Sequence, residues 1–410
     1  MSTADTGRMP SHVRLTVLLC FLAALCEGIN LQAAGVAAAG ISQQFHPGSR
    51  LLSYFFTSNT VGLLFGASIG GRLADRFGRK AVLVWSVAVF GFFTLVTAWV
   101  WNMESLIIFR LVAGLGLGGS LPNLVALGAE GASREKRNTY VTIIYSGMPL
   151  GGVLASLVAL VIEPAQWTWI FIVGGITSLI IAPVIGRWLP ESQAFEALRA
   201  AGKGVGTGQR NGGLLAVLGE GRAFTTLLLW VSFFLELLTL YLLLNWLPTL
   251  LVAGGLTKAQ AAAGMITFNL GGCLGSIYVG FYLDSSQRRR AILTTFIGLP
   301  LILLLLAHVS FGAALMISLA FVLGVAVLAA QAILYAFAPL CYPARIRGSG
   351  VGFAVAVGRF GSMAGPLLGG LLVAGGRSPS HVLNGLFPIL LVGSLCAIFL
   401  TWRPHPAEAT

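Results

Sequence analysis

The chain has 410 residues, of which 57% are hydrophobic and only 9% are charged, and its formal net charge is +12. A typical soluble domain carries about 25% charged residues, so this composition excludes an ordinary soluble enzyme or binding module and indicates a membrane protein. In a soluble chain the positive charge would suggest a nucleic-acid partner. Here the positions of the Lys and Arg residues along the sequence suggest a different reason for the positive charge, which concerns the membrane.

Apolar stretches long enough to cross a bilayer recur along the whole sequence. A membrane-spanning helix needs about 20 predominantly apolar residues. Twelve stretches meet this requirement, at 14–37, 51–72, 80–101, 105–129, 139–161, 168–189, 223–253, 259–283, 291–308, 311–339, 349–374 and 383–402. We therefore predict an all-α membrane protein with twelve transmembrane helices.

The basic residues fall mostly on one side of the predicted membrane. If the N-terminus is cytoplasmic and the spans alternate, the opposite side holds only Arg50, Lys258 and Arg377 of the 25 Lys and Arg residues. Cytoplasmic loops of membrane proteins carry an excess of Lys and Arg. Both termini are therefore expected in the cytoplasm, the lipid bilayer is the expected environment, and no nucleic-acid partner is needed.

The two halves of the chain resemble each other at a shift of 209 residues. Glu27 and Glu236 then coincide, each in the middle of an apolar span, and Asp75 coincides with Asp284. A carboxylate within hydrocarbon is costly and usually functional. Its repetition in two halves predicts a transporter with a site near the membrane midplane.

The longest loop divides the predicted spans six against six. It contains Gly202–Gly208, whose composition is typical of a flexible linker. We expect an N-terminal six-helix bundle at 1–190, a cytoplasmic linker at 191–222 and a C-terminal six-helix bundle at 223–410, with pseudo-symmetry between the bundles.

No segment of the sequence has the motifs of an enzyme. There is no Walker loop, no nucleophile elbow and no His/Cys cluster with metal-binding spacing. We predict no enzymatic activity, no cofactor and no metal. An ion gradient, or the gradient of the substrate itself, is then the expected source of energy for transport.

Arg110 lies inside the fourth predicted span, where a guanidinium cannot lose its charge and needs an acidic partner. Glu27 is about 20 Å deep when counted from Arg14, and Arg110 is about 9 Å deep when counted from Glu104 on the other side. Both depths fall in the outer half of the membrane, so we predict a Glu27–Arg110 pair that protonation of Glu27 releases. Two separate polar cavities are the alternative.

The loop after the second span has the pattern G-x-x-x-D-R-x-G-R-K over Gly71–Lys80, with a degenerate copy in the second half. This motif, the six-plus-six helices and the central linker resemble the major facilitator superfamily. The resemblance implies that this loop gates the change between inward-facing and outward-facing states without contacting substrate. The gating residues it implies are Gly71, Asp75, Arg76, Gly78, Arg79 and Asp284.

The segment Glu27–Gly35 narrows the resemblance. Glu27-Gly-Ile-Asn30 resembles the acid-Gly-x-Asp motif of the aromatic acid:proton symporters, and Leu31–Gly35, Asn245–Pro248 and Gly358–Gly361 are similar to bacterial 3-(3-hydroxyphenyl)propionate transporters in that family. This implies a monomer in the bacterial inner membrane that imports an aromatic carboxylate together with protons.

Asn30 departs from this motif because it stands where the family has a second acid. An amide cannot titrate. Either Glu27 alone carries the proton or Glu236 shares the task; an engineered substitution is a third explanation.

Arg359 lies close to the midplane in the eleventh predicted span, where its fork suits a substrate carboxylate. An internal pair with Glu236 is the alternative. Together with Arg359, the residues expected to line an aromatic-walled substrate site are Asn30, Tyr145, Phe233, Tyr241, Gln331 and Tyr335.

Trp246, near the end of its span, is expected to anchor at the membrane interface.

A second motif keeps a rival function open. Gly361–Gly370 has the pattern G-x-x-x-G-P-x-x-G-G, which resembles the antiporter motif that drug exporters carry in their fifth helix. Here the fuller copy lies in the eleventh span, and we interpret it as a kinked, closely packed helix. A drug or metabolite antiporter is the main alternative, followed by a symporter of another organic anion.

Overall fold

The computed structural model describes residues 11–130, 137–192, 195–196, 214–283, 287–308, 312–343, 346–374 and 378–402. Within these ranges the chain is helical and contains no strand. The long helices of the first half are α1 (Ser11–Phe45), α2 (Ser49–Phe77), α3 (Arg79–Val96), α4 (Met103–Glu130), α5 (Arg137–Val161) and α6 (Thr168–Trp188). Those of the second half are α9 (Ala223–Ala253), α10 (Lys258–Leu283), α11 (Arg288–His308), α12 (Ala313–Phe337), α13 (Arg347–Ala374) and α14 (Pro379–Thr401).

The predicted spans agree closely with these helices, and α9 begins and ends at the predicted residues. Eleven of the helices are long and apolar enough to cross a membrane. The other long helix, α2, is more polar because it buries Ser53, Thr57, Ser58 and Asn59 in its first half. It packs against α4 within its own half and against α13 of the other half.

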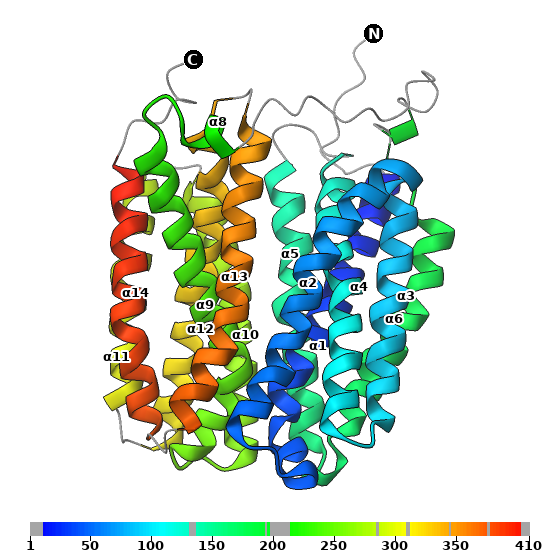
Figure 1. Cartoon of the computed structure of the whole chain (residues 1–410), viewed down its shortest axis with the longest axis vertical. Helices are drawn as coiled ribbons and strands as arrows, with labels where there is room; N and C mark the ends of the chain where they lie inside the picture. Colours follow the sequence, from blue (N-terminus) through cyan, green and yellow to red (C-terminus); the bar gives the residue numbers. More distant parts are fainter. Residues whose placement is uncertain are drawn as a thin grey trace.

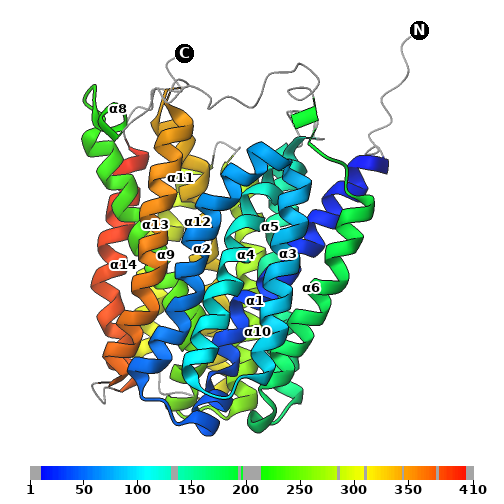
Figure 2. The same cartoon turned by 45° about the vertical axis from the view of Figure 1, so that its right-hand side comes forward.

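Two bundles lie side by side, one formed by α1–α6 and the other by α9–α14 (Figure 1). The start of α1 and the end of α14 lie at the same end of the molecule, next to the short helix α8 (Leu214–Leu218) (Figures 1 and 2). We call this end the terminus side and the other end the far side. The helices alternate in direction, so α10 ends and α11 begins on the terminus side.

Glycines allow the helices within each bundle to approach closely. A Cβ atom at Gly66 of α2 would lie 2.0 Å from the backbone oxygen of Leu115 on α4. In the second bundle, a Cβ atom at Gly365 of α13 would lie 2.2 Å from the backbone oxygen of Leu238 on α9. Small residues at such crossings are typical of membrane helix packing. The close-packing interpretation of the Gly361–Gly370 segment is therefore confirmed.

Candidate functional site

A cavity of about 620 Å³ lies between the two bundles. At one end its lining includes Leu283, the last residue of α10, and Arg288, the first residue of α11. At the other end the lining stops at Gln32, Leu244 and Asn269, well inside the helices that carry them. The cavity therefore extends from the middle of the molecule to its terminus side and is closed towards the far side.

Glu27 lies in the middle of α1 and lines this cavity. One of its carboxylate oxygens, Oε2, accepts a hydrogen bond from the hydroxyl of Ser120 on α4, at 2.8 Å. The same hydroxyl lies 2.9 Å from the backbone oxygen of Leu117. A hydroxyl can donate one hydrogen bond and also accept. Ser120 can thus donate to ionised Glu27, or accept from protonated Glu27 while it donates to Leu117.

Arg359 extends into the cavity from α13, in the other half. Its Nη1 atom donates a hydrogen bond to the hydroxyl of Tyr241, at 3.1 Å. Tyr145, Tyr335 and Glu27 line the same cavity as Arg359. Among the described residues, no carboxylate forms an ion pair with Arg359. Its remaining N–H groups can therefore bind a ligand carboxylate in the cavity.

The aromatic wall that the sequence predicted is partly present. Tyr145, Tyr241, Gln331 and Tyr335 line the cavity. Phe233 does not; it is buried behind Tyr335, and the two rings form an edge-to-face pair with centroids 5.1 Å apart. Phe233 therefore supports the ring of Tyr335 and does not itself contact a ligand in the cavity.

The predicted Glu27–Arg110 pair is wrong. Arg110 is fully buried, and its Nη2 atom donates to the backbone oxygen of Asn30, at 2.7 Å. The residue of α4 that reaches Glu27 is Ser120, which lies roughly 15 Å further along the helix. The depth estimate failed because α1 has 35 residues, more than a membrane span needs, so its ends do not mark the membrane surfaces.

Asn30 does not line the cavity, contrary to prediction. Its Nδ2 atom donates to the backbone oxygen of Cys26 at 2.8 Å and to the hydroxyl of Ser178 at 3.0 Å. Ser178 belongs to α6, so the amide faces the interior of the first bundle. Asn30 and Arg110 thus form part of the packing around α1 and lie away from the ligand space.

Glu236 is buried in α9 but is not among the residues that line the cavity. Its Oε1 atom has no hydrogen-bond partner among the described residues, and neither Arg359 nor any other described cation forms an ion pair with it. The described structure therefore does not contain the alternative that the sequence left open, an internal pair between Glu236 and Arg359. Only Glu27 faces the cavity.

Contacts between the two halves close the far side. A Cβ atom at Gly35 of α1 would lie 2.3 Å from the backbone oxygen of Leu244 on α9. Trp246 of α9 forms an edge-to-face pair with Phe56 of α2, with centroids 5.2 Å apart. Trp246 is 1% exposed, so its predicted place at the membrane interface is wrong. It is a packing residue between the bundles.

Gln32 of α1 and Asn269 of α10 join the halves at the closed end of the cavity. Gln32 Nε2 donates to Asn269 Oδ1 at 2.6 Å, and Asn269 Nδ2 donates to Gln32 Oε1 at 2.8 Å. Our sequence analysis did not predict either residue as part of the site. Uncharged amides within apolar spans do not stand out from the sequence as a buried Glu or Arg does.

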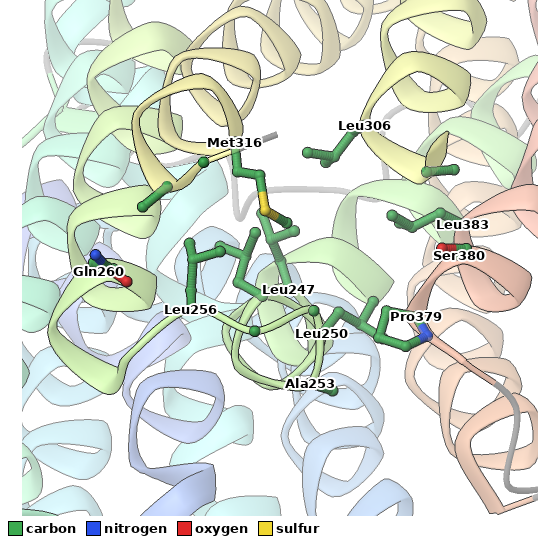
Figure 3. A pocket seen from close by; sticks show the side chains of 16 residues that line it. Leu247, Leu250, Ala253, Leu256, Gln260, Leu306, Met316, Pro379, Ser380 and Leu383 are labelled. Atoms are coloured by element: carbon green, nitrogen blue, oxygen red, sulfur yellow. The ribbon is translucent and has the colours of Figure 1, made fainter. Parts of the chain in front are cut away.

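A second cavity of about 570 Å³ lies within the far side of the second bundle (Figure 3). Leucine side chains dominate its wall, with Met316 beside Leu247, and Gln260 and Ser380 at its edges (Figure 3). None of the described residues that line it is charged, and it shares no lining residue with the central cavity. Its described lining therefore offers no cation that could pair with a carboxylate.

The predicted gating loop joins α2 to α3 on the terminus side. Gly71, Asp75 and Arg76 belong to the last turns of α2, and Gly78 makes the turn with a φ of 97°, a conformation that favours glycine. A Cβ atom at Gly78 would also lie 2.3 Å from Glu191 Oε2. The backbone conformation therefore favours glycine at this turn, and a side chain here would also displace the Glu191 carboxylate.

Two acids that the sequence analysis did not single out hold this loop. Arg79 forms an ion pair with Glu130 at the end of α4, and Glu130 also accepts from the hydroxyl of Ser192 at 2.7 Å. Glu191 Oε1 accepts from the backbone N–H of Lys80 at 3.0 Å. These bonds tie the loop to the ends of α4 and α6.

Asp75, one of the gating residues that the resemblance implies, lies near the end of α2. It is exposed, and within the described ranges its carboxylate forms no ion pair and no side-chain hydrogen bond. Its copy in the second half, Asp284, lies outside the described residues, as does most of the predicted linker. The roles of both acids in gating stay predictions.

Comparisons with known proteins agree with this architecture. A family model described as Major Facilitator Superfamily matches residues 20–312 and residues 229–410. The chain is 41% identical to the 3-(3-hydroxy-phenyl)propionate transporter of Escherichia coli (strain K12), with 98% of each chain covered. It is 32% identical to a gallate transporter of Pseudomonas putida, covering 90% of this chain and 88% of the relative.

Solved structures share the fold at low sequence identity. The crystal structure of a D-xylose-proton symporter superposes with a TM-score of 0.76 and 18% identity, covering 96% of this chain and 98% of that one. The inward open conformation of the xylose transporter XylE from E. coli gives a TM-score of 0.77 at 16% identity, covering 97% and 99%. The two bundles, their packing and the match of the family over most of the chain place this integral membrane protein in the major facilitator superfamily.

Proposed function

We propose that the protein imports an aromatic carboxylate together with protons, and that the cargo is an acid of the 3-(3-hydroxyphenyl)propionate type. The observation that carries the proposal is Arg359 in a cavity lined by Tyr145, Tyr241 and Tyr335. A guanidinium binds a carboxylate through paired hydrogen bonds. Aromatic side chains suit a planar ring. The names of the relatives, which include carriers of hydroxylated aromatic acids, support the same class of cargo.

The coupling step is a competition between two carboxylates for Arg359. Glu27 lies close enough to Arg359 to attract it when ionised. Protonation of Glu27 removes that attraction and leaves Arg359 to the carboxylate of the substrate. Ser120 provides a hydrogen bond to Glu27 in either state. Release of the proton then returns Arg359 to Glu27 and weakens substrate binding.

The terminus side is the cytoplasmic side in this proposal, and the membrane is the bacterial inner membrane. The described conformation then faces the cytoplasm, the state from which cargo is released. The loop from Gly71 to Lys80 gates the exchange with the outward-facing state, and a single chain is sufficient for transport.

Arg359→Lys tests the carboxylate site. Lysine retains the charge but loses the planar fork, so binding of the acid should weaken about tenfold. Binding of the corresponding amide, which has no charge, should change by less than about twofold. Titration calorimetry on the purified protein measures both. Equal losses for the acid and the amide would show that Arg359 supports the cavity in general and does not bind the carboxylate.

The direction of coupling separates import from the antiporter alternative. In proteoliposomes, an inside-alkaline pH gradient should drive accumulation of the labelled acid, because proton and acid then enter together. An antiporter would accumulate the acid only under an inside-acid gradient. Accumulation under the second condition alone would refute symport while leaving the substrate class intact.

A further inference from the structure

The amide pair between Gln32 and Asn269 is the polar link at the closed end of the central cavity. Each amide donates one hydrogen bond to the other, at 2.6 and 2.8 Å, and both side chains are buried, at 4% and 2% exposure. Gln32 belongs to the first bundle and Asn269 to the second. Separation of the bundles at this level therefore has to break both bonds.

The surroundings hold this pair in one arrangement. A Cβ atom at Gly152 of α5 would lie 2.0 Å from Gln32 Nε2, so only glycine leaves room for the amide there. Asn269 Nδ2 also donates to the backbone oxygen of Met265, at 2.9 Å. Gln32 is thus fixed between α5 and α10, with its amide at the wall of the cavity.

The amides have capacity for a further partner. An amide group offers two N–H donors and an oxygen that accepts twice. The reciprocal bonds use one N–H and one acceptor position of Gln32. A hydroxyl that reaches this end of the cavity can bond to Gln32, and it can replace the lost partner when the bundles separate. A buried amide left without a partner is costly.

The rise along α1 from Glu27 to Gln32 is comparable to the length of a hydroxyphenylpropionate. Gln32 follows Glu27 on α1 by about 7.5 Å along the helix axis. In an extended 3-(3-hydroxyphenyl)propionate, ordinary bond lengths put the hydroxyl roughly 7 Å from the carboxyl carbon. In 3-hydroxybenzoate this separation is about 2 Å shorter. An acid that binds Arg359 on the Glu27 side of the cavity would therefore direct a hydroxyl at its other end towards the amides, and a longer side chain extends this reach.

We propose that Gln32 and Asn269 form a hydroxyl-binding subsite that also latches the far side of the cavity. The proposal rests on the proposed function, because it needs an aromatic acid whose carboxylate binds Arg359. The amides then determine specificity: they favour cargo that carries a ring hydroxyl at the far end from its carboxylate.

The test compares binding of 3-(3-hydroxyphenyl)propionate and 3-phenylpropionate, which differ by the hydroxyl alone. In the unaltered protein the hydroxylated acid should bind about tenfold more tightly. In the double variant Gln32→Met/Asn269→Leu the ratio should fall to about one, through weaker binding of the hydroxylated acid. Gln44→Met, the same change on α1 outside the cavity, should leave the ratio unaltered.

Two further variants keep the test decisive. The exchanged pair Gln32→Asn/Asn269→Gln retains both amides and should recover part of the preference. If the double variant does not give monodisperse protein, Gly152→Ala, which displaces the Gln32 amide, should reduce the preference as well. A ratio that stays the same in the variants, while both acids still bind through Arg359, would overturn the subsite alone. Failure of both acids to bind the unaltered protein would overturn the proposed function and the subsite with it.

Discussion

Glu27 and Glu236 occupy equivalent positions in the two halves of the chain, yet their surroundings differ. Glu27 lines the central cavity and accepts a hydrogen bond from Ser120. Glu236 is buried outside the cavity and has an oxygen without a partner among the described residues. Both halves therefore carry the acid, but in the described structure only Glu27 combines access to the cavity with a hydroxyl that serves either protonation state.

The largest effect is expected from Glu27→Gln, which keeps the size of the side chain but cannot exchange a proton. Uptake driven by a pH gradient should fall to the passive level, because binding and release of cargo are no longer linked to a proton. Counterflow exchange of labelled acid should persist, since it needs no net proton movement. Both are measured in proteoliposomes.

Counterflow provides the internal control for this experiment, because it shows that the variant is folded and still binds cargo. Accumulation of the acid to the level of the unaltered protein would show that Glu27 is not the essential proton carrier. It would also remove the functional difference between the two acids.

A smaller effect is expected from Ser120→Ala, which removes the hydroxyl from Glu27 and leaves the carboxyl group in place. Both protonation states of Glu27 then lose a partner, so gradient-driven uptake should slow by about three- to tenfold. Ser120→Thr retains a hydroxyl and should keep most of the rate. Equal rates for Ser120→Ala and the unaltered protein would mean that the hydrogen bond at 2.8 Å does not contribute to coupling.

The positions of the helices could be predicted from the sequence because the length of an apolar stretch is a local property. The main exception is the end of α1, which continues to Phe45 instead of ending near residue 37. A tertiary contact accompanies this extension: Trp167 donates a hydrogen bond from Nε1 to Gln44 Oε1, at 2.7 Å. Contacts of this kind cannot be derived from hydrophobic length.

The charged members of the site could also be predicted, because a Glu or Arg within an apolar span is conspicuous. Their partners could not. Ser120, Gln32 and Asn269 are uncharged polar residues of a kind that many membrane helices contain, and only the register of α1 against α4 and α10 brings them to the cavity. The Glu27–Arg110 pair was predicted incorrectly for the same reason, because the sequence does not give the register of α1 against α4.

The smallest effect on transport is expected from Glu236→Gln, the counterpart of the change at Glu27. Gradient-driven uptake should stay within about twofold of the unaltered protein, because no described partner links Glu236 to the cavity. Glu236→Leu should raise the thermal transition of the purified protein, since it removes a buried polar group whose burial costs about 1 to 3 kcal/mol when it lacks a hydrogen bond. Loss of accumulation with intact counterflow in Glu236→Gln would instead make this acid a second proton carrier. The cavity would then have to reach α9 in the outward-facing state, and the two halves would be functionally as well as structurally duplicated.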